Sequence, residues 1–288
     1  GKEVLKEQFR VDGNNFSRTF RLQLTAGEPG MHHYVIRLST SENEVTTANN
    51  RSDLFIDVLK SKQKVLILAN SPHPDISALK TAISSNMNYE VEDFLIREFN
   101  GPLDDFSLVI LHQLPSSRPE SRPMLERIRR MKLPVLYVIG PQTNFSEFNR
   151  MNAGMIITPY NAGRSNEVLP VLEDGFSLFR PGDELRRLIP DLPPLTAPFA
   201  RYNTVLAARV LLSQKVGSVE SRDPLWMLHD DGQSRNGVIC GSGLWKWRMK
   251  TWLETGRHNA FNELVNKSIQ YLAVKDDKRR FRVSSDAS

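Results

Sequence analysis

The N-terminal part of the chain alternates hydrophobic and polar side chains, which is typical of strands with one buried face. The alternation runs through residues 16–26 and 31–40, and a further strand is expected at residues 53–59. A Gly-Glu-Pro-Gly turn at residues 27–30 separates the first two strands. Since no helical pattern interrupts them, we expect residues 1–61 to be a partial β-sandwich.

Beyond residue 61 the alternation gives way to short, continuously apolar runs. Such runs are typical of strands that are buried on both faces of a parallel sheet. They occupy residues 64–70, 106–115 and 133–144, and a more polar strand is expected at residues 89–96. Because exposing several large apolar side chains is costly, we expect the three apolar strands to be parallel neighbours in the sheet interior.

Helical patterns separate these strands. Apolar residues recur at helical intervals over residues 76–83, after Asp75 as the expected helix N-cap, and residues 123–132 form an amphipathic pattern. Alternating strands and helices predict βαβ units. The fold class predicted for residues 62–275 is therefore α/β, a flavodoxin-like, doubly wound and mainly parallel sheet.

The second half of this region is less regular. Residues 152–204 are rich in turns and proline. The elements expected in this half are strands at 167–173, 205–212, 224–231 and 236–243 and helices at 244–255 and 260–274. Trp245 and Trp252 lie seven residues apart on one helical face, which we interpret as core. Residues 276–288 are expected to be a linker into a following domain.

The composition is that of a soluble globular protein. Of its 288 residues, 40% are hydrophobic and 25% are charged. No apolar run approaches the ~20 residues that span a bilayer, and no signal peptide opens the chain. The net charge of +5 is scattered along the chain, so nucleic-acid binding is not expected. Cys240 is the single cysteine, which excludes an intrachain disulfide framework.

Several of these segments carry a resemblance to a known family. Residues 64–83, 107–115 and 134–140, and above all the Gly-Leu-Trp-Lys-Trp-Arg-Met stretch at 243–249, resemble the class I glutamine amidotransferase-like domain of large bacterial envelope proteins. Residues 26–59 are similar to the end of an adhesion-type immunoglobulin-like module. The resemblance implies a periplasmic or membrane-associated parent protein, whose partners are its own further domains or other envelope proteins.

The catalytic groups of active amidotransferases are not recognisable in this sequence. An active enzyme carries a cysteine on a tight strand-to-helix turn and a histidine base on a later strand. The corresponding turn reads Gly140-Pro141-Gln142, and the later site reads Gly241-Ser242-Gly243. The sequence therefore predicts no catalytic residue of this class.

Cys240 is the alternative nucleophile. It precedes a small-residue turn of the strand–turn–helix kind, and His229 is the partner it would need. A free cysteine more often behaves as a small buried hydrophobic residue. We favour this structural interpretation and keep a hydrolase that uses Cys240 with His229 as the alternative.

A ligand crevice is a further hypothesis. In open α/β sheets ligands bind beyond the carboxyl ends of the strands, where His73, His112, Gln142 and Asn144 are expected. The interpretation that we favour is that these are polar loop residues with no joint task. The histidine spacing shows no metal-binding signature, and neither a metal nor a cofactor is expected.

These observations favour a non-catalytic module of a multidomain bacterial envelope protein, with a role in structural assembly or partner binding. Two alternatives remain open: an amidotransferase-related enzyme or hydrolase, and a small-ligand sensor at the carboxyl ends of the strands.

Overall fold

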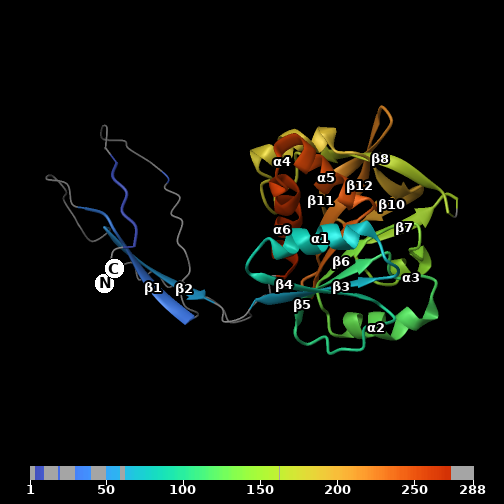
Figure 1. Ribbon diagram of the computed structural model, residues 1–288, viewed down its shortest axis with the longest axis horizontal. Helices are drawn as coiled ribbons and strands as arrows, with labels where there is room; N and C mark the ends of the chain where they lie inside the picture. The colour runs from blue at the N-terminus through green and yellow to red at the C-terminus, as the bar shows by residue number, and fades with distance from the viewer. Residues whose placement is uncertain are drawn as a thin grey trace. The chain divides into compact units, whose positions relative to one another are not determined.

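The computed structural model describes residues 4–9, 19, 30–39, 50–58, 62–161 and 163–273 (Figure 1). The strand expected at residues 16–26 and the linker expected at residues 276–288 lie outside this part, apart from residue 19. The chain divides into two compact units, Gly1–Ser61 and Lys62–Ser288.

In the first unit two strands form an antiparallel pair. Strand β1 (Gly30–Arg37) pairs with β2 (Arg51–Val58), with His33 opposite Phe55. The strands predicted at residues 31–40 and 53–59 are thereby confirmed. The immunoglobulin-like character of this unit stays a prediction.

The second unit is built on a nine-stranded sheet with helices on both faces (Figure 1). In their order across the sheet, the strands are β4 (Tyr89–Leu95), β3 (Gln63–Ala69), β5 (Phe106–His112), β6 (Val135–Val138), β13 (Arg235–Ile239), β12 (Val219–Asp230), β11 (Arg209–Val216), β8 (Ser165–Leu172) and β9 (Leu195–Pro198). A separate antiparallel pair consists of β7 (Met155–Pro159) and β10 (Ala200–Thr204).

The helices occupy the segments between the strands and the end of the described chain. They are α1 (Pro74–Ser84), α2 (Arg122–Arg130), α3 (Phe145–Asn149), α4 (Asp183–Leu188), α5 (Leu244–Thr255) and α6 (Asn259–Ala273), with 3₁₀ turns η1 (Pro119–Ser121) and η2 (Ile189–Asp191). The predicted helices at 244–255 and 260–274 are confirmed almost residue for residue.

Only half of the sheet is parallel. Strands β4, β3, β5, β6 and β13 run parallel, as predicted for the three apolar runs, and β3, β5 and β6 are interior neighbours. From β13 to β9 every neighbouring pair is antiparallel. The prediction of a mainly parallel sheet is therefore corrected to a mixed sheet, because β11, β12 and β13 follow one another through short turns that force antiparallel pairing.

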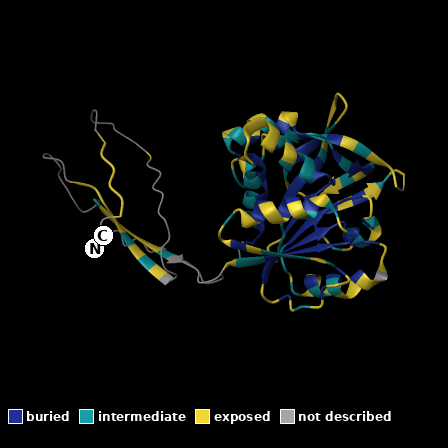
Figure 2. Cartoon of the chain, in the orientation of Figure 1, coloured by how far each residue is buried: buried dark blue, intermediate teal, exposed yellow. Residues whose placement is uncertain are grey.

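Alternate side chains of the central strands fill two cores, and these strands are coloured as buried in Figure 2. On β3, Val65 and Ile67 pack with residues of α1, α5 and α6, while Leu66 and Leu68 pack with residues of α2 and α3. All four side chains are buried. The central strands are thus buried on both faces, as the continuous apolar runs predict.

Two local predictions are wrong. The N-cap of α1 is His73 and not Asp75, since Pro74 takes the first helical position, where its missing N–H costs nothing. On α5 the fully buried tryptophan is Trp247, whereas Trp252 is 52% exposed and stacks on His258. Spacing alone identified a shared face but not which face turns inward.

Among the described residues, no helix is long and apolar enough to span a membrane.

Candidate functional site

The candidate site lies where the direction of the chain reverses across the sheet. After β3 the chain moves to β4 on one side, and it then returns to β5 on the other side of β3. The carboxyl ends of β3 and β5 therefore form a topological switch point, where open α/β sheets bind ligands. His73 follows β3, and His112 is the last residue of β5.

His73 is fixed by its capping role. Its extended backbone conformation places the ring at the start of α1, where Nδ1 accepts a hydrogen bond from Asp75 N at 3.2 Å. This contact requires an unprotonated Nδ1. Burial lowers the pKa of His73 below its ordinary value, with Asp75 opposing the shift and His112 adding to it. The ring is consequently neutral at pH 7, and a quarter of the side chain is exposed.

Asp75 connects the first helix of the unit to α5. Its buried carboxylate accepts hydrogen bonds from Gly243 N at 2.8 Å and Trp245 N at 2.9 Å, two donors at the start of α5. Gly243 adopts a left-handed conformation (φ 111°) that aims these donors at the carboxylate.

The protonation state of Asp75 follows from these contacts. Burial by itself raises the pKa of Asp75, but the contact with His112, the two N–H donors and His73 together lower that pKa below its ordinary value. The group is therefore a carboxylate at neutral pH, beside the partial positive charge of a helix N-terminus.

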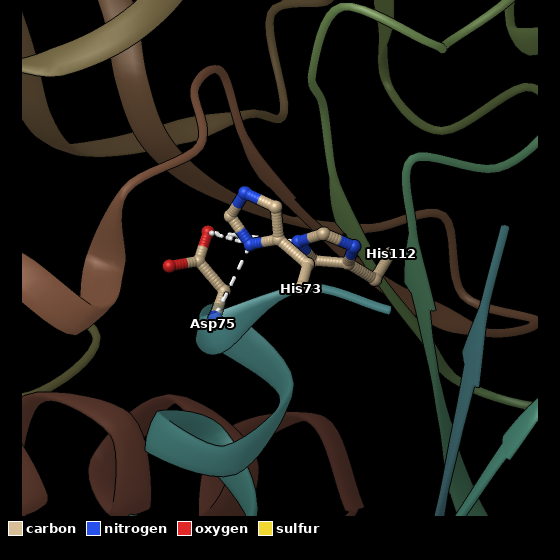
Figure 3. Close-up of side chains that lie close together, drawn as sticks. All are labelled: His73, Asp75 and His112. Carbon is tan, nitrogen blue, oxygen red and sulfur yellow. Dashed lines mark hydrogen bonds and ion pairs between the residues drawn. The ribbon is translucent and has the colours of Figure 1, made fainter. Parts of the chain in front are cut away.

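His112 is the least satisfied polar group of the site. The residue is fully buried, and neither ring nitrogen has a hydrogen-bond partner within the described part of the chain. Its Nε2 lies 3.5 Å from Asp75 Oδ2, and its ring lies 4.7 Å from that of His73 (Figure 3). Buried nitrogens without hydrogen-bond partners are costly and uncommon in native proteins.

A network of amides borders this cluster. Asn70 and Ser71 at the end of β3 both donate to Gln142 Oε1, the latter at 3.0 Å. Gln142 N in turn donates to Gln113 Oε1 at 3.1 Å. Asn70 N donates to the carbonyl of His112 at 3.1 Å, which joins the amides to the cluster.

The four residues expected in the crevice are therefore placed unequally. His73 and His112 lie against each other. Gln142 accepts hydrogen bonds from Asn70 and Ser71 at the end of β3. Asn144 is the N-cap of α3, where its side chain accepts from Glu147 N at 3.1 Å and contacts Ser117 at 3.4 Å. No contact joins Asn144 to the histidines in the described structure.

Asp75 is the residue that sequence reasoning missed as a member of the site. It was expected to cap α1, and only the fold shows that its carboxylate faces two histidines and a distant helix. The available signal was its position two residues after His73, in the segment that follows a buried strand.

The alternative nucleophile is buried and isolated from its expected base. Cys240 is fully buried, and its Sγ lies 3.6 Å from Met155 Sδ. Burial raises the pKa of Cys240 far above its ordinary value. Cys240 N donates a hydrogen bond to Leu225 O on β12. Leu225 lies four residues before His229, and four residues correspond to about 13 Å along an extended strand. This geometry offers no activated thiolate.

The two positions expected from the sequence resemblance to match catalytic sites, Gly140 and Ser242, make structural contacts. A Cβ atom on Gly140 would approach the side chain of Gln113 to 2.7 Å. Ser242 exchanges backbone hydrogen bonds with Thr196 at 2.9 and 3.0 Å.

Two surface hollows in the described region lie away from the cluster. One is lined by residues of α2 and of the β12–β13 turn, including Ile128, Lys132 and Asp231. The other is lined by residues after β8, including Phe176 and Phe179. Neither contains a residue of the histidine cluster.

Comparisons with known proteins reveal distant structural likeness alone. No family model matches the chain, and no curated protein matches it in sequence. A ThuA-like protein from Bacteroides uniformis is 13% identical with a TM-score of 0.47, covering 77% of this chain and 96% of its own. PurLQS from Thermotoga maritima is 15% identical with a TM-score of 0.42, covering 73% of this chain and 99% of its own.

Larger proteins match as well. The β-galactosidase from Bacillus circulans is 13% identical with a TM-score of 0.42, and the match covers 75% of this chain. This chain spans about a third of the length of the first structures it matches, namely 32%, 33% and 32%. Likeness at these identities and TM-scores carries no information on activity.

Proposed function

We propose that the α/β unit is a binding module without amidotransferase chemistry, and that its ligand site is the cluster of His73, Asp75 and His112. The observation that supports this proposal most strongly is His112, a buried imidazole whose Nδ1 has no partner in the described structure and whose Nε2 approaches an ionised carboxylate only to 3.5 Å. Poorly satisfied buried nitrogens weaken the unliganded fold, so this ring is best explained by a ligand that binds it.

The position of the cluster supports the same proposal. The switch point of a doubly wound sheet is where the loops after two neighbouring strands separate and leave room for a ligand. Here these loops carry polar groups from β3, β5 and β6, held by rigid strands. Precise placement on rigid elements is what a binding site requires.

The wider role belongs to the proposal too. The sequence resemblance suggests a module of a multidomain bacterial envelope protein that functions in structural assembly or partner binding. In that setting a ligand at the switch point would hold the loops of this unit in one conformation and so stabilise the surface that a partner contacts.

The proposal is tested by thermal unfolding in the presence of a defined panel of probes. The panel contains divalent metal ions, inorganic phosphate, acetate and glucose, each added to the tag-free chain. We expect at least one probe to raise the unfolding temperature of the unaltered protein. The shift should vanish in His112→Phe, which removes both nitrogens while keeping a planar ring, and persist in the control Cys240→Ala.

Two results would contradict the proposal. One is the absence of a shift with every probe of the panel. The other is a shift that survives His112→Phe but disappears in Cys240→Ala, which would favour the hydrolase alternative. The same preparations should release no ammonia from glutamine above a control without protein, because the expected cysteine and histidine positions hold Gly140 and Ser242.

A further inference from the structure

We propose that the ligand of this site is a divalent transition-metal ion, bound by His73 Nδ1, Asp75 Oδ2 and His112 Nε2. This inference rests on the proposed function and names the ligand class. It is drawn from the arrangement of the three side chains, which come from two separate strand ends (Figure 3).

The distances between the donor atoms suit one ion. All three atoms lie within 4.8 Å of one another, with His73 Nδ1 3.4 Å and His112 Nε2 3.5 Å from Asp75 Oδ2. Zinc binds imidazole nitrogen and carboxylate oxygen at about 2.0–2.2 Å, so two ligands of one ion lie roughly 3–4 Å apart. Little movement of the side chains is needed to place an ion between them.

The donor types select the class of ion. Two neutral imidazoles and one carboxylate suit zinc, iron, cobalt or nickel, whereas magnesium and calcium prefer sets of oxygen ligands. Three protein ligands leave at least one coordination position open. His73 has a quarter of its side chain exposed, which gives the site contact with solvent.

An ion would satisfy one of the two ring nitrogens of His112 that lack a hydrogen-bond partner in the described structure, namely Nε2. His112 Nε2 would exchange a 3.5 Å approach to Asp75 for a direct bond to the ion. His73 Nδ1 would give up the long 3.2 Å hydrogen bond from Asp75 N. Asp75 would keep its bonds from Gly243 N and Trp245 N, which orient its carboxylate as second-shell donors commonly do.

The arrangement of the donor atoms also favours an ion. The two surface hollows described above lie elsewhere in the unit. The cluster itself presents donors converging on a single point, with two of its three side chains fully buried. Convergence of this kind matches an ion more closely than an extended organic molecule.

The test uses the whole tag-free chain, stripped with a chelator and titrated with Zn²⁺ by calorimetry and with Co²⁺ by absorption spectroscopy. We expect one ion per chain and Co²⁺ bands of a nitrogen- and oxygen-ligated site. His73→Ser removes a ligand but keeps an N-cap for α1, and His112→Phe removes the buried ligand. Each should weaken binding at least about tenfold, since loss even of a second-shell partner costs 10–100-fold.

The matched control is His33→Ala. His33 Nε2 lies 2.5 Å from Asp53 Oδ1, so this exposed histidine–carboxylate pair in the other unit offers similar donors without the third ligand. We expect His33→Ala to bind the metals as the unaltered protein does. A loss of binding confined to His33→Ala would overturn the inference, as would unaltered affinity in His73→Ser and His112→Phe.

The Co²⁺ spectrum of the unaltered protein keeps the inference falsifiable even if His112→Phe fails to fold. A spectrum identical to that of the aqueous ion would overturn it. If the metals fail while phosphate or acetate stabilises the protein in a His112-dependent manner, the metal inference falls and the proposed binding function stands.

Discussion

Asp75 illustrates how one side chain holds distant parts of the unit together. Its carboxylate satisfies two backbone donors of α5 that lie 168 and 170 residues further along the chain. The same group faces His73 and His112. These hydrogen bonds stabilise the fold whether or not a ligand is bound, so their contribution to the free energy of unfolding can be measured separately.

Replacing Asp75 with alanine should therefore destabilise the unit. The change leaves two buried N–H groups without acceptors, and hydrogen bonds to charged groups contribute about 1.5–3 kcal/mol each, so we expect a loss of about 3 kcal/mol. Urea unfolding followed by circular dichroism measures it. The control Asp93→Ala breaks the exposed pair with Lys80 and should cost less than about 1 kcal/mol. Equal effects of the two changes would contradict this account of Asp75.

Cys240 should be chemically silent in the folded protein. Burial raises the pKa of Cys240, so the thiol is protonated at neutral pH. Because the side chain is also buried, a mild disulfide reagent cannot reach it. We expect labelling to follow global unfolding and to reach one thiol per chain in denaturant. Fast stoichiometric labelling of the native protein, abolished by replacing His229, would reveal an activated thiolate and revive the hydrolase alternative.

At the scale of elements, the β12–β13 hairpin offers a test of pH dependence. Asp230 accepts hydrogen bonds from Gly232 N at 2.8 Å and Arg235 Nε at 2.9 Å. The backbone bond, followed by the Arg235 contact, lowers the pKa of Asp230 although partial burial opposes the shift. The carboxylate thus binds protons less readily in the folded state than in the unfolded state.

The sign of the effect follows by linkage. A group with a depressed folded pKa contributes stability above its unfolded pKa of about 3.9, and this contribution is lost as pH falls through the lower folded value. Asp230→Asn should therefore lower stability at pH 6 by less than about 1 kcal/mol, because the side chain is a third exposed. Unfolding curves of the two proteins at pH 6 and pH 2 measure it. A difference that grows towards pH 2 would contradict the prediction.

The elements themselves were largely predictable from sequence, but their directions were not. The continuous apolar runs of β3, β5 and β6 identify strands buried on both faces, and the helical spacing in α5 and α6 identifies two long helices. Periodicity carries no information on strand direction, so the antiparallel half from β13 to β9 appeared only in the structure. The N-cap of α1 was misassigned because aspartate and histidine compete for that role within three residues.

At the scale of the whole molecule, the described residues that build both hydrophobic cores of the α/β unit all follow Ser61. The first core residue is Val65 and the last is Ala273. Removing residues 1–61 should therefore leave the thermal midpoint of this unit within a few degrees of its value in the full chain. Differential scanning calorimetry of both proteins measures this, and loss of cooperative unfolding in the shortened chain would contradict it.

At this scale, two of the three residues of the cluster were candidates from the sequence, and the third was not. The rule that ligands gather at the carboxyl ends of strands placed His73 and His112 together before the fold was known. It could not supply Asp75, because the role of that carboxylate depends on α5, which packs beside α1 only in the folded unit. The histidine spacing gave no metal signature for the same reason: the two rings lie 39 residues apart in sequence and meet only through parallel pairing of β3 with β5.

The central claim is that the cluster of His73, Asp75 and His112 binds a divalent metal ion. It is tested most directly by following the ring nitrogens of all six histidines by ¹⁵N NMR while Zn²⁺ is added to the unaltered, tag-free protein. The account predicts that the signals of His73 and His112 move together and stop moving at one equivalent, while those of the other four histidines stay in place. Movement of other histidines instead, or of none, would contradict it.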